Sequence, residues 1–280
     1  MCASENLVCA SQLLDDVCRL RFAGATDQGL RRKSNEDCHG LFPAESLFVL
    51  ADGMGGAAAG EIAARMAVEL THDAFVGAGV PSSRGAGRSA LTRLVGAVEQ
   101  ANHGVYWASR GSQALRGMGT TLAALAACGP RAALVHVGDS RIYRLRGCRL
   151  EQLTEDHSLF NEFVRAGYAD PDRPEDFPHR NVITRSLGTH PTVEVEARLV
   201  DVEIGDTFLL CSDGLCGVLA HDELEEVLIA HADLDEAVKQ LVACANDQGG
   251  PDNITAVLVR WEQALSPASC DGAAARRDAA

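Results

Sequence analysis

The sequence repeats one local arrangement: a short apolar run with strand character that ends or begins at an aspartate beside a turn residue. LFVLA runs into Asp52 and GMGG, TFLLCS runs into Asp213 and Gly214, and GGP leads into Asp252 before NITAVLV. Apolar, β-branched runs bounded by such residues are typical of strands, and a single Asp-Gly is typical of a turn. The recurrence predicts a fold in which several strands carry carboxylates at their ends.

The spacing of the apolar runs favours an α+β fold. Strands are predicted at about residues 20–26, 47–51, 121–127, 132–137, 140–145, 193–200, 207–211 and 254–260. Helices are predicted at about residues 60–77, 88–108, 222–230 and 233–246. Because strands and helices do not alternate strictly, antiparallel sheets covered by helices are favoured over a parallel doubly wound sheet. Within ALVHVGDSRIYRLRG, the residues Gly138, Asp139 and Ser140 predict the turn of an antiparallel hairpin.

Length and charge restrict the organisation and the partners of the chain. It has 280 residues and a formal net charge of −14, which disfavours nucleic acid or an anionic membrane surface as a partner. We expect one folded domain over residues 19–262, between a loosely ordered segment at 1–18 and a disordered tail at 263–280. No uncharged apolar run approaches the ~20 residues of a membrane helix, and the first residues lack the order of a signal peptide. We therefore expect a cytoplasmic protein.

The ten cysteines indicate neither a disulfide framework nor a metal site. They are scattered and form no Cys-x2-Cys pair, so we expect reduced thiols without a catalytic role. Cys270 and Arg276 have the Cys-x5-Arg spacing of cysteine phosphatases, but the residues between them lie in a polar, alanine-rich tail. Because a reactive thiolate needs rigid surroundings, which a tail lacks, we assign no cysteine-based phosphate loop.

The glycines after Asp52 are compatible with a dinucleotide site. Gly53, Gly55 and Ala58 match the G-x-G-x-x-G/A pattern that binds a pyrophosphate. That pattern also requires an acidic residue after a second strand, and the candidate, Asp73, falls within a predicted helix. In addition, Asp52 would repel the pyrophosphate, which weakens this interpretation.

The alternative is that Asp52 itself binds a metal ion together with other carboxylates near strand ends. Asp213, Asp252 and the neighbours Glu36 and Asp37 all flank strand-like runs. Carboxylates without histidine or cysteine partners are hard oxygen ligands, which suit Mg²⁺ or Mn²⁺ and not zinc. Carboxylates brought close together repel one another unless cations neutralise them. The sequence therefore predicts a divalent-metal site.

Eight segments in order along the chain resemble the bacterial branch of the protein phosphatase 2C family, the metal-dependent protein serine/threonine phosphatases. They are DQGLRRKSNED (27–37), ADGMGGAAAGE (51–61), GMGTT (117–121), VGDSRIY (137–143), LTEDHS (153–158), ITRSLG (183–188), LLCSDGL (209–215) and PDNIT (251–255). The resemblance implies a four-layer α-β-β-α sandwich, in which helix pairs flank two antiparallel sheets and a dinuclear metal site lies at one edge. It also implies a flap-like insert within residues 158–188. Thr120 and Thr121 of GMGTT are interpreted as strand and packing residues.

The resemblance implies two metal ions, Mn²⁺ or Mg²⁺, and in bacterial members a third. Asp52 would bridge the first two ions, with the Gly53 carbonyl on one of them and Asp213 and Asp252 on the other. The further ligands implied are Asp37, Glu36 through water, and Asp139 with Asp213 at the third ion.

The implied reaction is hydrolysis of phosphoserine and phosphothreonine in proteins by a metal-activated water. Asp52 and Asp213 would act through the ions, and the planar guanidinium of Arg32 would hold two phosphate oxygens. Animal members carry a histidine where this chain has Met54, so the general acid stays unassigned, and we interpret His39 as a surface or outer residue. The implied partners are phosphorylated proteins and a cognate kinase, and the chain would act as a monomer. The alternative is a catalytically silent regulator of the same fold that binds phosphoproteins.

Overall fold

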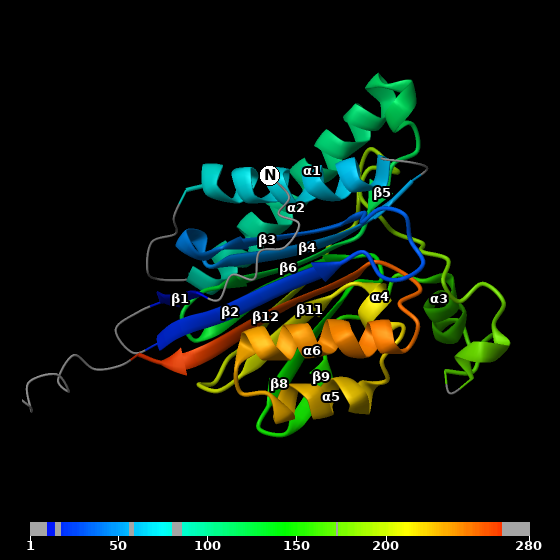
Figure 1. The fold of residues 1–280 in the computed structure, drawn as a ribbon. Coiled ribbons are helices and arrows are strands. Elements are labelled where there is room, and N and C mark those ends of the chain that lie inside the picture. Colours follow the sequence, from blue (N-terminus) through cyan, green and yellow to red (C-terminus); the bar gives the residue numbers. More distant parts are fainter. Residues whose placement is uncertain (1–9, 15–17, 56–58, 80–85, 172, 265–280) are drawn as a thin grey trace, which may run out of the picture.

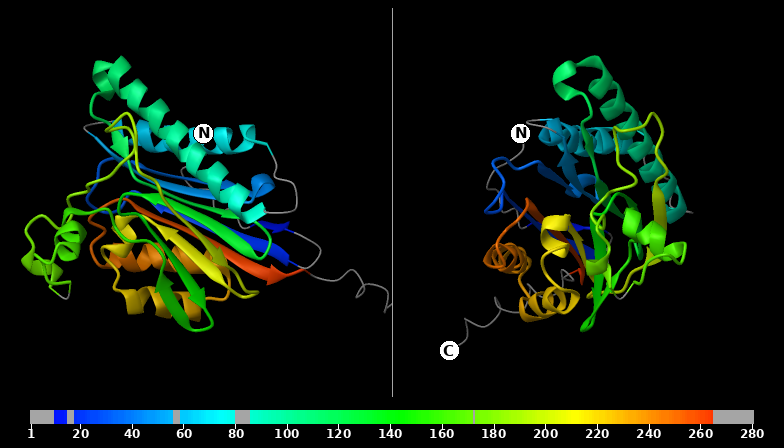
Figure 2. Two further views of the ribbon diagram at one scale, coloured as in Figure 1. Left: turned by 180° about the vertical axis from the view of Figure 1, so that it is seen from behind. Right: turned by 90° about the vertical axis from the view of Figure 1, so that its right-hand side faces the viewer.

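The described part of the chain folds into four layers (Figures 1 and 2). The computed structural model describes residues 10–14, 18–55, 59–79, 86–171 and 173–264. Two antiparallel sheets lie face to face, and helices cover the outer face of each sheet. The predicted α+β class and the α-β-β-α sandwich are confirmed.

Strands from distant parts of the sequence make up each sheet. The first sheet has the order β1 (Ala10–Leu13), β2 (Cys18–Asp27), β12 (Ile254–Gln263), β11 (Thr207–Cys211), β8 (Arg141–Arg146) and β9 (Arg149–Gln152). The second has the order β10 (Glu196–Asp201), β7 (Arg131–Val137), β6 (Leu122–Ala127), β4 (Leu47–Met54) and β3 (Asp37–Phe42), and β5 (Gly119–Thr120) also pairs with β4. All eight predicted strands occur. The apolar pattern missed β1, β3, β5 and β9 because these strands are short or contain few apolar residues.

Helix pairs cover the outer faces of both sheets. α1 (Ala59–Gly77) and α2 (Ala86–Gly111) lie on the second sheet, whereas α5 (His221–Ala230) and α6 (Leu234–Asp247) lie on the first. In α6, the Asp233 carboxylate caps the N-terminus and apolar residues recur at helical spacing on the buried face, at Leu234, Ala237, Val238, Leu241 and Ala245. None of the helices in the described ranges is both long enough and apolar enough to cross a membrane.

A small lobe extends from one edge of the sandwich (Figure 1). It lies within the predicted flap-like insert and contains α3 (Leu159–Arg165) and the 3₁₀ turn η3 (Pro174–Asp176). Its base is closed by an isolated β-bridge between Ser158 and Ile183. The short helix α4 (Asp213–Cys216) lies at the same edge. Two further 3₁₀ turns are η1 (Pro43–Glu45) and η2 (Gln113–Leu115).

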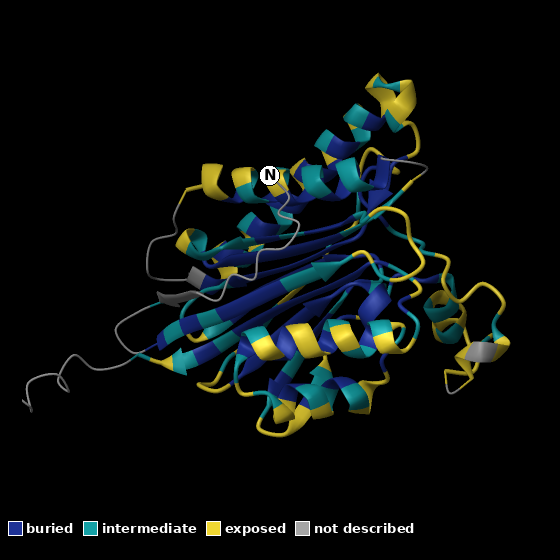
Figure 3. Ribbon diagram, in the orientation of Figure 1, coloured by how far each residue is buried: buried dark blue, intermediate teal, exposed yellow. Residues whose placement is uncertain are grey.

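Alternation along the strands divides the core into three apolar layers. In β4, Phe48 and Leu50 pack between the two sheets, whereas Val49 faces α1 and α2. In β11, Leu210 packs between the sheets, whereas Leu209 faces α5 and α6. Figure 3 shows the result: the strands are mostly buried, and exposed residues gather on the outer faces of the helices. Each strand therefore has an inter-sheet face and a helix face.

The inter-sheet face becomes polar at the edge that carries α4. On the second sheet, Leu50 is followed on the same face by Asp52. On the first sheet, Val257 is preceded on the same face by Thr255, and Ser212 follows the last inter-sheet residue of β11. The strand period of two therefore carries polar side chains from both sheets into one space.

The predicted hairpin around Asp139 is wrong. β7 pairs with β6 and β10, whereas β8 pairs with β11 and β9, so the two strands belong to different sheets. Residues 138–140 instead cross from the second sheet to the first at the polar edge. Two apolar runs around a tight turn predict strands but not their partners, because alternation determines only which face of a strand is buried.

The described strands extend slightly beyond the predicted domain limits, 19–262, at both ends. The segment expected to be loosely ordered, 1–18, contains β1, which pairs with β2, and the first residue of β2. At the other end, Gln263 still belongs to β12 and pairs with Cys18. Residues 265–280, with Cys270 and Arg276, lie outside the described residues.

Candidate metal centre

Four aspartates meet at the polar edge because the ends of antiparallel strands lie there. β3 begins at Asp37, directly opposite Asp52 near the end of β4. In the first sheet, Asp213 begins α4 just after β11, and Asp252 stands two residues before β12. The charges of the other three aspartates all raise the pKa of Asp52, so the four carboxyl groups lie close enough to interact.

Ionising all four carboxyl groups together is costly. Burial raises the pKa of Asp37 to about 7, and the charges of Asp213 and Asp252 contribute to the shift. Burial and the charges of Asp37 and Asp213 raise the pKa of Asp52 well above its ordinary range. Burial and the charge of Asp252 likewise raise the pKa of Asp213. The protein thus concentrates negative charge that cations would neutralise.

Several carboxylate oxygens at this edge are buried without a hydrogen-bond partner. They include the Oδ1 atoms of Asp37, Asp139 and Asp213. Buried polar atoms in proteins are normally hydrogen-bonded, and leaving a carboxylate oxygen unpaired is unfavourable. Divalent Mg²⁺ and Mn²⁺ prefer such oxygen ligands. The side chains present therefore fit the predicted metal centre.

Two glycines allow the backbone to pack closely beside the aspartates. A Cβ at Gly53 would lie 2.1 Å from the Gly60 carbonyl oxygen, and a Cβ at Gly60 would lie 2.0 Å from Glu36 Oε2. The Gly53 N–H donates to the Glu36 carbonyl at 3.1 Å. Glu36 is therefore held against the first turn of α1, where burial raises its pKa.

The dinucleotide interpretation of this loop is wrong. A pyrophosphate fingerprint belongs to a parallel β-α-β unit, but β4 pairs antiparallel with both β3 and β6. Asp73, the residue that would bind the ribose, lies inside α1. Ala58 lies outside the described residues.

Asp139 reaches the edge from the crossover between β7 and β8. Gly138 has φ +109°, and a Cβ there would lie 2.6 Å from Thr121 Cγ2, so a side chain at this position would be strained. His157 forms two hydrogen bonds with Gly138 of the crossover. Its ring Nδ1 accepts the Gly138 N–H, and its backbone N–H donates to the Gly138 carbonyl. Burial and the charge of Asp213 raise the pKa of Asp139 to about 7. Asp139 thus lies near Asp213, its predicted partner at a third ion.

Arg32 lies at the edge, but its guanidinium binds a carboxylate. Its Nη2 donates to Asp252 Oδ2 at 2.5 Å, and its side chain is 53% exposed. The guanidinium therefore competes with any cation for Asp252. Because it is largely exposed, it is also accessible to a phosphate that arrives at the edge.

A cavity of about 650 Å³ opens between the aspartates and the flap lobe. Asp139, Asp213 and Asp252 line one side of it. Flap residues on the lining are Ser158, Phe160, Asn161, Pro174, Arg180 and Asn181. Its volume is in the range of small-molecule sites, so a phosphorylated side chain can enter it.

Sequence reasoning did not connect the buried hydroxyl groups of Thr120 and Thr121 with the aspartates. Thr121 Oγ1 accepts the Asp52 N–H at 3.0 Å, and Thr120 Oγ1 donates to the Asp52 carbonyl at 2.9 Å. Thr121 Oγ1 also lies 2.7 Å from Ser140 Oγ, beside Asp139. Thr120 lies in β5 and both threonines are fully buried, as predicted, but their hydroxyl groups also bond Asp52 and Ser140. The available signal was their position: in GTT, GDS, CSDG and DNIT, hydroxyl residues stand in or next to motifs that carry the acids.

His39 lies between the sheets and not on the surface. A Cβ at Gly24 of β2 would lie 2.9 Å from its Nε2, so the imidazole of β3 packs against the facing sheet. Burial lowers the pKa of His39 to about 4, which keeps the ring neutral.

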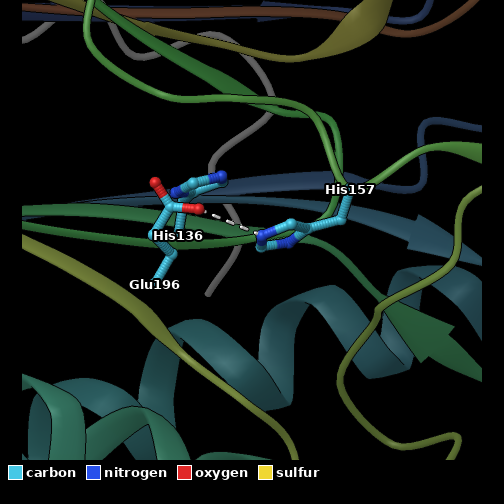
Figure 4. Close-up of side chains that lie close together, drawn as sticks. All are labelled: His136, His157 and Glu196. Atoms are coloured by element: carbon cyan, nitrogen blue, oxygen red, sulfur yellow. Dashed lines mark hydrogen bonds and ion pairs between the residues drawn. The ribbon is translucent and has the colours of Figure 1, made fainter. Parts of the chain in front are cut away.

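A second cluster of ligand-type side chains consists of His136, His157 and Glu196 (Figure 4). Their ligand atoms all lie within 4.8 Å of one another. Since the Gly138 N–H can only donate, His157 Nδ1 accepts, and the proton of the neutral ring is on Nε2, which lies 3.4 Å from Glu196 Oε2. Burial, with the nearby His136 and Arg185, lowers the pKa of His157 to about 3 and keeps this ring neutral.

Two geometric features oppose a metal ion in this second cluster. The rings of His136 and His157 are stacked, with centroids 4.6 Å apart and an angle of 11° between the planes. Nitrogen lone pairs lie in the ring planes, so two parallel rings cannot both direct them at one ion. His136 Nε2 also bonds the Glu155 carbonyl at 2.9 Å, so it carries the proton. The cluster fits a hydrogen-bond network that holds the crossover, and not a metal site.

Known proteins share both the sequence and the fold. The Protein phosphatase 2C family model matches residues 31–261. The serine/threonine phosphatase Stp of Listeria monocytogenes serotype 4b is 38% identical over 237 residues, which cover 84% of this chain and 93% of the relative. The solved serine/threonine phosphatase PstP of Mycobacterium tuberculosis has a TM-score of 0.78 and 36% identity, and the match covers 88% of this chain and 99% of that one.

A further solved structure, the catalytic domain of PstP in complex with two manganese ions, has a TM-score of 0.77 and 34% identity. The match covers 88% of this chain and 99% of that chain. The family model, the sequence relatives and the solved structures agree with the architecture described above. The chain belongs to the protein phosphatase 2C family.

Proposed function

We propose that this chain hydrolyses phosphoserine and phosphothreonine in proteins, with Mn²⁺ or Mg²⁺ as its cofactor. The observation that carries the proposal is the set of buried, unpartnered carboxylate oxygens of Asp37, Asp139 and Asp213 beside an open cavity. The family is one of phosphatases, and a solved relative holds two manganese ions. When bound, such ions activate a water molecule for attack on phosphorus.

Each acidic residue at the edge has a proposed role in holding the ions. Asp52 would serve both ions, the Gly53 carbonyl would serve one of them, and Asp213 and Asp252 would serve the other. Asp37 would complete the set directly or through water. The remaining assignments are Glu36 through water, and Asp139 with Asp213 at a third ion.

Other residues orient the substrate and the aspartates. Arg32 leaves Asp252 when a phosphate arrives and binds two of its oxygens with the planar guanidinium. Arg141 forms a bidentate ion pair with Asp156, at 2.8 and 2.7 Å, on the wall of the cavity next to Asp139. This pair fixes the start of β8, next to the crossover, relative to the segment that leads into the flap.

The substrates, the partner kinase, the location and the oligomeric state of the chain are also proposals. Phosphorylated proteins are the substrates, and a cognate serine/threonine kinase makes them. The cytoplasmic location and the monomeric state are our predictions from the sequence. The substrate enters between the aspartates and the flap, because the cavity opens there.

The test compares Asp52→Asn with Asp73→Asn, a matched change at an exposed aspartate of α1. We expect Asp52→Asn to lower Mn²⁺-dependent release of phosphate from a phosphothreonine peptide by more than the roughly 10–100-fold that loss of an outer partner costs. The Asp73 variant should keep its activity. Full activity of Asp52→Asn would contradict the site assignment. A parent protein that binds Mn²⁺ and phosphopeptides but releases no phosphate would instead be the catalytically silent regulator.

A further inference from the structure

Two hydroxyl groups of the first sheet hold Asp37 of the second sheet. Asp37 Oδ2 accepts the hydroxyl protons of Ser212, at 2.8 Å, and of Thr255, at 2.6 Å. Both hydroxyl residues are 0% exposed, and Asp37 is 5% exposed. Asp37 belongs to β3, whereas Ser212 directly follows β11 and Thr255 is the second residue of β12 in the other sheet. These bonds therefore join the two sheets at the polar edge.

The direction of each hydrogen bond around Asp37 can be assigned. The Thr255 hydroxyl donates to Asp37, so Thr26, whose Oγ1 lies 2.8 Å away, must donate to Thr255. Asn35 Nδ2 in turn donates to Thr26 Oγ1 at 2.8 Å. The result is a chain of donors that runs from Asn35 through two hydroxyls to the carboxylate, and bonds in such chains strengthen one another.

Ser212 is held equally firmly. Its Oγ accepts the Thr255 N–H at 3.0 Å while its proton points to Asp37. Asp37 N–H donates to Asn35 Oδ1 at 3.1 Å, which fixes the backbone of the same residue. Both the main chain and one carboxylate oxygen of Asp37 are therefore restrained.

The two oxygens of the Asp37 carboxylate have different surroundings. Oδ2 has two short hydroxyl donors, whereas Oδ1 is buried and has no partner. Rotation of the carboxylate would break both hydroxyl bonds, so Oδ1 cannot easily turn toward another donor. The protein thus holds one oxygen and leaves the other for a ligand.

We propose that Ser212 and Thr255 are positioning residues that set the affinity of the metal centre by holding Asp37 with Oδ1 presented to an ion. This inference rests on the proposed role of Asp37 as a metal ligand. Outer partners that orient a ligand contribute roughly 10–100-fold to metal affinity. Neither hydroxyl needs to touch the ion or the substrate.

The experiment uses variants of nearly equal shape that differ in the hydroxyl. Thr255→Val keeps the shape and removes the donor, whereas Thr255→Ser keeps the donor and removes a methyl group. Ser212→Ala provides an independent loss of the second donor. The matched control is Thr71→Val in α1, where a fully buried threonine has a hydroxyl without a hydrogen-bond partner. Mn²⁺ binding is measured by isothermal titration calorimetry, and phosphatase activity is measured as a function of Mn²⁺ concentration.

We expect Thr255→Val and Ser212→Ala each to weaken one Mn²⁺ binding step by roughly 10–100-fold. Activity should then need more Mn²⁺ but approach the parental kcat at saturation, because the catalytic groups remain. Thr255→Ser should bind Mn²⁺ like the parent, and so should Thr71→Val.

An Asp37→Ala variant separates the inference from the function on which it rests. If Asp37→Ala weakens Mn²⁺ binding while Thr255→Val and Ser212→Ala bind like the parent, the positioning role is overturned and the ligand assignment stands. Equal losses in Thr255→Val and Thr255→Ser would show that packing and not the hydroxyl matters, which also overturns it. If Asp37→Ala itself binds Mn²⁺ like the parent, the assignment of Asp37 as a ligand fails. Circular dichroism of each variant verifies that it is folded.

Discussion

The four aspartates at the sandwich edge and the cluster of His136, His157 and Glu196 both consist of side chains that can hold a metal ion, yet their hydrogen bonding differs. In the histidine cluster, His157 Nδ1 accepts the Gly138 N–H and His136 Nε2 donates to the Glu155 carbonyl. The proton on His157 Nε2 faces Glu196. At the acidic edge, buried carboxylate oxygens have no partner. Both regions bring potential ligand atoms close together. Buried oxygens without a hydrogen-bond partner are found at the acidic edge and not in the histidine cluster.

This difference shows which feature marks a metal site in a protein without bound ions. Most buried polar groups in a structural network find partners, because an unpaired buried group is costly, and single exceptions such as the Thr71 hydroxyl are not surrounded by like charges. Carboxylates that repel one another and keep unpaired oxygens are stable only if something else compensates. At the acidic edge, cations or, in their absence, protons relieve this repulsion, whereas the histidine cluster contains no such group of carboxylates.

The largest expected effect follows from metal removal. A chelator should abolish phosphatase activity and lower the thermal unfolding midpoint, because ions that bind only the folded state stabilise it. In the metal-free protein, the pKa of Asp37 and of Asp139 is raised to about 7, above the value of about 4 in an unfolded chain. Their protonated forms favour the fold, so this contribution to stability is present below about pH 4 and is lost as the pH rises toward 7.

The stabilisation by Mn²⁺ should accordingly increase between pH 5 and pH 8. Thermal unfolding with and without Mn²⁺ across this range measures the increment, and the metal-free samples serve as the reference at each pH. An increment that stays constant from pH 5 to pH 8 would contradict the view that the aspartates repel one another without ions.

A smaller effect is expected from Arg32→Ala. Loss of charged hydrogen bonds to the phosphate should reduce kcat/KM by roughly 10–100-fold, mainly through KM. Mn²⁺ affinity should not fall, because Arg32 competes with the ion for Asp252. Steady-state kinetics and calorimetry test both statements, with Arg31→Ala as the control at the neighbouring exposed arginine. A loss of Mn²⁺ affinity equal to that of Asp52→Asn would mean that Arg32 supports the metal centre and not the substrate.

The smallest effect is expected from Glu196→Gln. The amide keeps the shape and an acceptor for His157 Nε2, and the residue is exposed, so unfolding free energy should change by no more than about 0.5 kcal/mol. The number of bound Mn²⁺ ions should stay the same as in the parent, as counted by elemental analysis after dialysis. If Glu196→Gln bound one Mn²⁺ ion fewer than the parent, the histidine cluster would be a metal site and the distinction drawn above would fail.

Local patterns predicted much of the fold and of the site. The apolar runs around Leu50 and Leu210 indicated strands, and the acids beside them were selected as ligands before any geometry was known. The reason is that strand alternation and turn chemistry are encoded within a few residues. The same local patterns did not predict β3 and β9, because these strands contain few apolar residues. They form by pairing with the more apolar strands β4 and β8.

The sequence alone determined that carboxylates stand at the ends of several apolar strands and that their oxygens suit Mg²⁺ or Mn²⁺. Only the tertiary structure decided that β7 and β8 join different sheets, that Arg32 binds Asp252, and that Ser212 and Thr255 hold Asp37. These contacts link residues that are far apart in the chain, so no short-range pattern encodes them. They exist because two sheets stack with their polar ends at the same edge, and that arrangement depends on how all the strands pair.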